Sequence, residues 1–182
     1  MNLANKITMS RLFMIPIFVF ILETDIVPYS RQVAAAVFVI AALTDALDGY
    51  IARSRNMITN FGKLMDPLAD KILVCAALIY LSALGDLSPV IVVLIISREF
   101  IITGLRLAAS LNNVVLAAGG TGKIKTVCQM IMIVLLLADI GGTIFSVINE
   151  AFIWLSVIFT IVSAAEYISK NRSVFLDASE ES

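Results

Sequence analysis

Long runs of apolar residues alternate with short polar segments along the whole chain. The apolar runs fall near residues 9–23, 31–53, 62–82, 89–109, 124–140 and 147–167. A helix needs roughly 20 largely apolar residues to cross a lipid bilayer, and these runs are close to that length. The pattern therefore predicts an all-α integral membrane protein with six transmembrane helices.

The first apolar run is preceded by a segment, residues 2–11, that is less apolar than the rest of the run. We expect this short interfacial N-terminal segment to lie along the membrane surface before the first transmembrane helix. Asn5, Thr8 and Arg11 recur every third residue within it, so they share one face of a helix. By themselves, these three residues are better explained by helix capping and anchoring at the membrane interface than by a functional role.

The composition supports a membrane protein and leaves no room for a second domain. Hydrophobic residues make up 60% of the 182 residues, and the mean hydropathy is +0.98. Six helices of membrane-spanning length use about two thirds of such a chain, so we expect one domain over residues 1–182. The acidic segment at about 173–182 is predicted to be a disordered tail. The net charge of −1 does not favour a nucleic-acid partner.

Lysine and arginine gather at alternate ends of the apolar runs. They lie around residues 6–11, 53–63, 106–125 and 170–172, whereas the connections near 24–30, 84–88 and 139–148 carry almost none. The positive-inside rule then places both termini in the cytoplasm, together with the connection between the second and third runs and that between the fourth and fifth. We expect a multi-pass protein of the cell membrane whose active site faces the cytoplasm.

Four aspartates interrupt the second and third apolar runs. They are Asp45, Asp48, Asp66 and Asp70, in a segment that reads D-x2-D-G-x2-A-R-x8-G-x3-D-x3-D and is called the acidic motif below. A carboxylate at the centre of a membrane helix costs about 2.5–3.5 kcal/mol on insertion scales. A bound divalent cation offsets this cost, and Mg²⁺ and Mn²⁺ prefer oxygen ligands. We therefore predict a site for two metal ions that serves phosphate chemistry.

Helical spacing places the acidic motif on two stripes. The first stripe consists of Asp45, Asp48, Gly49 and Ala52, and the second of Gly62, Asp66 and Asp70. Because the connection near 55–60 is short, we expect the two helices to be antiparallel neighbours whose stripes face each other. The small residues leave room for a flat ligand or a diphosphate, or else they allow close helix packing. Arg53 lies beside them and is suited to binding a phosphate oxygen.

A second group of charged residues spans the fourth run and the start of the fifth. We call the residues Arg98, Thr103, Arg106, Lys123 and Lys125 the basic cluster. Arg98 and Glu99 fall near the middle of the fourth run, a depth at which ionisable residues are usually functional. We predict that the basic cluster binds an anionic, phosphate-bearing substrate. The alternative is that Arg98 and Glu99 pair with other buried groups, while the two lysines only mark the cytoplasmic side.

The acidic motif resembles the signature of the CDP-alcohol phosphotransferases. The run Asp-Ala-Leu-Asp-Gly-Tyr-Ile-Ala-Arg at 45–53, followed by Gly62, Asp66 and Asp70, matches that signature without a departure. The six expected helices and the chain length also agree with this family. Within it, segments 5–11, 98–106 and 122–126 are most similar to the members whose acceptor is glycerol 3-phosphate.

The resemblance implies an enzyme that transfers a phosphatidyl group from CDP-diacylglycerol to glycerol 3-phosphate and releases CMP. It also implies a homodimer in a lipid membrane with two divalent cations, Mg²⁺ or Mn²⁺. By this resemblance the four aspartates are metal ligands, and Asp70 is also the general base toward the acceptor hydroxyl. The implied CDP-binding residues are Asn5, Thr8, Arg11, Asp48, Gly49, Ala52, Arg53 and Gly62. The basic cluster would bind the phosphate of the acceptor.

Two alternatives remain open at this point. The same chemistry with another acceptor is one of them: inositol phosphate also calls for a cationic site, whereas serine does not. A divalent-cation transporter is the other, because intramembrane aspartates also mark ion paths. Against a transporter, the acids lie on two adjacent helices near one membrane face, and the sequence has no convincing internal repeat.

Overall fold

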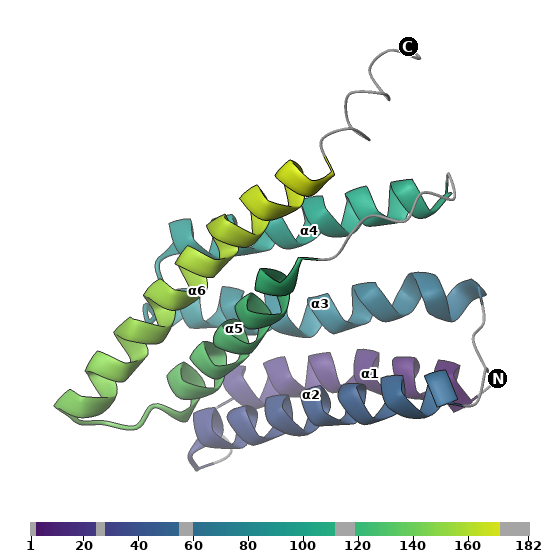
Figure 1. The fold of residues 1–182 in the computed structure, drawn as a ribbon. Coiled ribbons are helices and arrows are strands. Elements are labelled where there is room, and N and C mark those ends of the chain that lie inside the picture. Colours follow the sequence, from purple (N-terminus) through teal and green to yellow (C-terminus); the bar gives the residue numbers. More distant parts are fainter. Residues whose placement is uncertain (1–2, 25–27, 55–59, 112–118, 172–182) are drawn as a thin grey trace. The chain divides into compact units, whose positions relative to one another are not determined.

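The computed structural model describes residues 3–24, 28–54, 60–111 and 119–171, and in 3–12, 45–54, 60–70, 108 and 110–111 it describes the backbone alone. These residues form helices and no strand. The helices are α1 (Leu3–Glu23), α2 (Ser30–Ser54), α3 (Asn60–Ala83), α4 (Pro89–Leu111), α5 (Gly120–Ala138) and α6 (Thr143–Lys170), shown in Figure 1. Each contains most or all of one predicted apolar run, so the all-α prediction with six helices is confirmed.

The start of the chain differs from the prediction. Helix α1 begins at Leu3 and continues to Glu23 without interruption, so no break separates an interfacial segment from the first apolar helix. The physical reason is the absence of a helix breaker, since no glycine or proline precedes Pro16. Pro16 itself lies inside the helix, which membrane helices tolerate.

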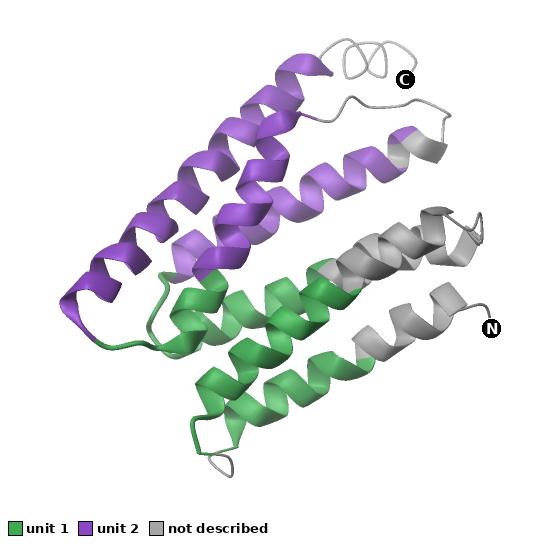
Figure 2. Cartoon of the chain, turned by 60° about the horizontal axis from the view of Figure 1, so that its bottom comes forward, with its two compact units in different colours: residues 1–88, 133–141 green, residues 89–132, 142–182 purple. Residues whose placement is uncertain are grey.

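The chain divides into two units, coloured separately in Figure 2. Unit 1 consists of residues 1–88 and 133–141, and unit 2 of residues 89–132 and 142–182. Unit 1 therefore contains α1, α2, α3 and the end of α5, whereas unit 2 contains α4, the larger part of α5 and α6. The expected single domain over 1–182 stays a prediction.

In unit 1, helix α1 packs against both α2 and α3, and α2 also contacts α3. The rings of Phe18 and Phe38 are buried and contact each other, with centroids 6.2 Å apart and planes tilted by 48°. Ala34 and Ala41 flank Phe38 one turn to either side and are buried, so the backbones of neighbouring helices can approach closely. The Tyr80 hydroxyl donates to the Leu22 carbonyl oxygen at 2.5 Å, which ties α3 to the end of α1.

Arg31, in the first turn of α2, connects three segments of unit 1. Its guanidinium pairs with Asp86, after the end of α3, and donates to the Leu136 carbonyl oxygen in α5 at 2.7 Å. It also lies 3.3 Å from the carboxylate of the exposed Asp139. The planar guanidinium has five donors, which suits one side chain to several acceptors at once.

We expect Arg31→Ala to lower the stability of the protein by about 2 kcal/mol, because hydrogen bonds to charged groups contribute about 1.5–3 kcal/mol and their acceptors here are partly buried. The measurement is the Tm of the purified protein in detergent. Gln32→Ala is the matched control, since Gln32 makes one exposed bond to the Ala138 carbonyl at 3.0 Å. Equal Tm values for the Arg31 and Gln32 variants would contradict the role of Arg31.

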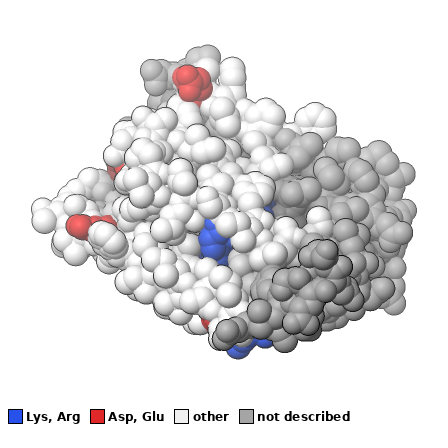
Figure 3. All heavy atoms as spheres, turned by 90° about the horizontal axis from the view of Figure 1, so that it is seen from above, with Lys and Arg blue, Asp and Glu red and all other residues white. Residues whose placement is uncertain are grey.

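Two helices of the described part, α5 and α6, are long and apolar enough to cross a membrane. Shorter apolar helical stretches cover residues 13–23, 30–44 and 71–83. Large apolar side chains are exposed on α6, among them Ile144, Val147 and Trp154, as expected of a surface that meets lipid. Figure 3 shows a face on which uncharged side chains predominate among the described residues. Membrane crossing by all six helices stays a prediction.

Candidate functional site

The acidic motif lies on helices of unit 1. Asp45 and Asp48 fall in α2, and Asp66 and Asp70 fall in α3, two helices that contact each other. The side chains of these aspartates lie outside the described residues. The same holds for the other residues predicted to bind CDP, which are Asn5, Thr8, Arg11, Gly49, Ala52, Arg53 and Gly62.

The described side chains contain no group of three or more His, Cys, Asp or Glu residues that could hold a metal ion. The metal prediction therefore concerns the acidic motif alone. Its donor chemistry fits, because four carboxylates on two contacting helices offer the hard oxygen ligands that Mg²⁺ and Mn²⁺ prefer.

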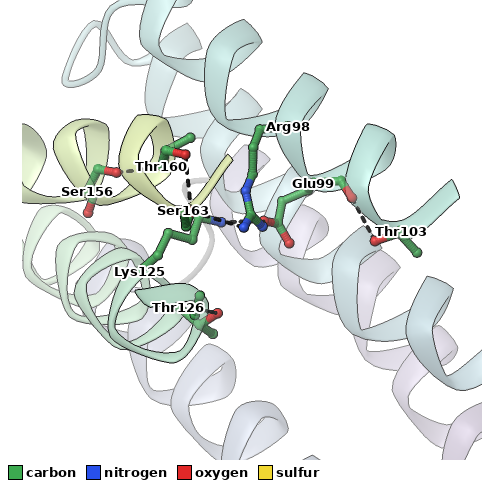
Figure 4. A network of polar contacts seen from close by, with 9 residues as sticks. Arg98, Glu99, Thr103, Lys125, Thr126, Ser156, Thr160 and Ser163 are labelled. Atoms are coloured by element: carbon green, nitrogen blue, oxygen red, sulfur yellow. Dashed lines mark hydrogen bonds and ion pairs between the residues drawn. The ribbon is translucent and has the colours of Figure 1, made fainter. Parts of the chain in front are cut away.

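The structure brings two members of the basic cluster together within unit 2, around the carboxylate of Glu99 (Figure 4). Arg98 and Glu99 are neighbours near the middle of α4, and Lys125 comes from the second turn of α5. Arg98 Nη1 donates to Glu99 Oε1 at 2.8 Å, and Lys125 Nζ donates to the same oxygen at 2.5 Å. Both cations thus converge on one carboxylate oxygen.

This Arg98–Glu99–Lys125 network is largely removed from solvent. The side chain of Lys125 is 1% exposed, and those of Arg98 and Glu99 are 15% and 13% exposed. Buried charges require partners, because the cost of removing them from water is several kcal/mol for each ion. The guanidinium of Arg98 and the ammonium of Lys125 are also the groups that bind phosphate oxygens in proteins.

Arg98 has further donors beyond its bond to Glu99. Its Nη2 donates to the hydroxyl of Ser163 on α6 at 3.0 Å, and its buried Nε has no hydrogen-bond partner among the described residues. The first turn of α5 also comes close, since a side chain at Gly122 would begin 4.0 Å from Nη2. The guanidinium of Arg98 is therefore positioned by Glu99 and Ser163, and its Nε remains as a further hydrogen-bond donor.

The other members of the basic cluster lie elsewhere in unit 2. The guanidinium carbon of Arg106 lies 5.4 Å from the ring centroid of Tyr167, a cation–π contact. The Thr103 hydroxyl donates to the Glu99 carbonyl oxygen of its own helix at 2.6 Å. Lys123 is exposed. The structure thus joins Arg98 and Lys125 in one network, while Arg106 pairs with an aromatic ring.

Polar residues of α6 were not singled out from the sequence. Ser156, Thr160, Ser163 and Tyr167 are buried, and they are spaced i, i+4, i+7 and i+11, which places them on one helix face. Ser163 holds Arg98, and the ring of Tyr167 lies under Arg106. A periodic polar stripe in a strongly apolar helix is the signal that could have identified this face.

The start of α5 is attached to the end of α6 through Glu166. The Thr121 hydroxyl donates to Glu166, and Lys170 pairs with the same carboxylate at 2.5 Å. A side chain at Gly119 would begin 2.8 Å from Glu166 Oε2, so the absence of a Cβ there permits this close approach. A carboxylate at a helix N-terminus is favourable, and this contact orients the start of α5, whose first two turns carry Lys123 and Lys125.

Comparison with known proteins gives consistent results. The family model for CDP-alcohol phosphatidyltransferase matches residues 1–162. The chain is 45% identical to the CDP-diacylglycerol–glycerol-3-phosphate 3-phosphatidyltransferase of Bacillus subtilis (strain 168), over 93% of this chain and 95% of that protein. It is 34% identical to the protein of the same name in Rickettsia bellii (strain RML369-C), over 96% of this chain and 97% of that protein.

Proposed function

This chain belongs to the CDP-alcohol phosphatidyltransferase family, and we propose that it transfers the phosphatidyl group of CDP-diacylglycerol to glycerol 3-phosphate. The products are phosphatidylglycerol phosphate and CMP. The observation that carries this proposal is the similarity to relatives named for that reaction over nearly the whole length of both chains. The two neighbouring cations Arg98 and Lys125 support a phosphorylated acceptor.

The four aspartates of the acidic motif are the proposed ligands of two divalent cations, Mg²⁺ or Mn²⁺. When bound, such ions neutralise charge on a diphosphate and stabilise the departing phosphate oxygen. The proposal rests on the donor type, since carboxylates are the ligands that these ions prefer, and on the contact between α2 and α3.

Asp70 is the proposed general base. Its carboxylate accepts the proton of the acceptor hydroxyl, whose oxygen forms a bond to the β-phosphorus of CDP-diacylglycerol while the bond from that phosphorus to the CMP oxygen breaks. Arg53 neutralises charge on the diphosphate. The other proposed CDP-binding residues surround the nucleotide; they are Asn5, Thr8, Arg11, Asp48, Gly49, Ala52 and Gly62.

The basic cluster is the proposed site for the acceptor's phosphate. Arg98 and Lys125 contribute charge at a buried position, and the Nε of Arg98 is a donor that a phosphate oxygen can use. Arg106, which lies over the ring of Tyr167, supplies a further guanidinium. Lys123 and Thr103 are the remaining residues proposed to bind the phosphate. A serine acceptor carries no phosphate and would not need such a site.

The proposed setting is the cell membrane. Six membrane-spanning helices with both termini and the active site on the cytoplasmic side agree with the positions of the basic residues. A homodimer is also proposed, by analogy with the family, and the exposed apolar side chains of α6 leave surface for both lipid and a second copy.

A screen of acceptors tests this function directly. Purified protein in detergent is incubated with CDP-diacylglycerol, with Mg²⁺ and Mn²⁺ in turn, and with glycerol 3-phosphate, inositol phosphate or serine. We expect CMP release with glycerol 3-phosphate, and no release after chelation of the metal. Faster release with another acceptor would reassign the substrate, and metal flux into liposomes without CMP release would favour a transporter.

A further inference from the structure

Glu99 occupies a position that an anionic ligand would also favour. One of its oxygens, Oε1, accepts from both Arg98 Nη1 at 2.8 Å and Lys125 Nζ at 2.5 Å. These are the charge-assisted contacts that a phosphate oxygen would form between the same two side chains. The protein therefore already places a negative charge of its own between the two most buried cations of the basic cluster.

Neutralisation of Lys125 alone does not explain this arrangement. The same carboxylate oxygen is shared by Lys125 and Arg98. Arg98 also has the hydroxyl of Ser163 to position it, so its orientation does not depend on Glu99 alone. What Glu99 adds is one negative charge at the position where an incoming anion would contact both Arg98 and Lys125.

We propose that Glu99 is a specificity-determining residue, because its carboxylate lowers the affinity of the basic cluster for a phosphate group that is not attached to the rest of the acceptor. An anion that offers only phosphate, such as inorganic phosphate, then binds weakly. A phosphorylated acceptor gains further contacts through the rest of the molecule and is retained. This inference rests on the proposed function, since it concerns the site assigned above to the acceptor's phosphate.

The effect follows from electrostatics at short range. Charges at contact distance in a partly buried site interact far more strongly than in bulk water, because the effective dielectric constant is lower. Removal of the Glu99 charge should therefore lower the Kd for phosphate at least about tenfold. The corresponding free energy is only a small part of the Coulomb energy between two charges at contact distance in a partly buried site. A purely structural role would instead leave anion binding unchanged or make it weaker.

The test uses the full-length protein in detergent and inorganic phosphate as the probe. Glu99→Gln keeps the shape of the side chain and an acceptor oxygen but removes its charge. We expect the Kd for inorganic phosphate, measured by calorimetry, and its Ki against glycerol 3-phosphate both to fall at least about tenfold. Glu99→Asp retains the charge and should stay within about threefold of the wild-type Kd. An unchanged or higher Kd in Glu99→Gln would overturn the proposal.

A second pair of variants covers the case in which Glu99→Gln does not fold because it breaks the buried ion pair with Lys125. Lys125→Met is compared with Lys125→Met/Glu99→Gln, and we expect the double variant to bind inorganic phosphate more tightly. Equal or weaker binding by the double variant would contradict the proposal. The calorimetric measurement needs no turnover, whereas CMP release by the wild type tests the proposed function, so the two can fail separately.

Discussion

Replacement of Asp70 by asparagine is expected to lower kcat for CMP release by about 10²–10⁴-fold, the range that general-base catalysis contributes. The amide cannot accept the proton of the acceptor hydroxyl, so the attack on phosphorus loses its base. CDP-diacylglycerol should still bind, because the change preserves the size of the side chain. The measurement is CMP release at saturating substrates and saturating Mg²⁺, with binding of CDP-diacylglycerol followed separately.

Two comparisons separate the base from a metal ligand. Asp45→Asn should be partly rescued by a higher concentration of Mg²⁺ or Mn²⁺, because its proposed role is ligation alone. Asp70→Asn should not be rescued. Asp177→Asn makes the same chemical change outside the residues that the family model matches, and should be neutral. Near-normal turnover by Asp70→Asn would remove Asp70 from the role of base.

Lys125→Met should raise the KM for glycerol 3-phosphate at least about tenfold and also lower the stability of the protein. The substitution removes the 2.5 Å contact to Glu99, whose carboxylate keeps its bond to Arg98, so the loss of stability should be smaller than the about 3–5 kcal/mol for breaking an isolated buried ion pair. The KM rises because a buried cation proposed to bind the acceptor's phosphate is lost. Steady-state kinetics with varied glycerol 3-phosphate and thermal unfolding in detergent measure the two effects.

Lys170→Met is the matched control for this change. It also removes a lysine from a 2.5 Å ion pair with a glutamate, but Lys170 is 49% exposed, and exposed pairs contribute little to stability. We expect a near-normal KM and a small change in Tm. If the two variants raise KM to the same extent, Lys125 is not part of the acceptor site and the placement of the acceptor in unit 2 is wrong.

The helices could be predicted from local patterns because hydropathy and helix-breaking residues act over one or two turns. Predicted and observed boundaries differ by a few residues at most positions, for example 62–82 against Asn60–Ala83 for α3. The larger difference is at α1, where a drop in hydropathy suggested a separate segment but no glycine or proline interrupts the helix before Pro16. A change in polarity alone did not end the helix.

Partners of buried charges could not be predicted in the same way. The sequence left open whether Arg98 and Glu99 pair with other groups or bind a ligand, and the structure shows that Glu99 pairs with both Arg98 and Lys125. Ser163, which is 65 residues from Arg98 along the chain, was not considered at all. Arg106 was grouped with Arg98, yet it contacts Tyr167 instead.

The sequence by itself determined the helical class of this protein, its family and the four aspartates that stand out within apolar helices, because each of these depends on residue types at fixed local spacing. Only the tertiary structure decided that one carboxylate serves two cations, since Lys125 lies 26 residues from Glu99 and reaches it through the packing of separate helices. The physical reason is that hydropathy and spacing act within a helix, whereas the partner of a buried charge depends on which faces of different helices meet.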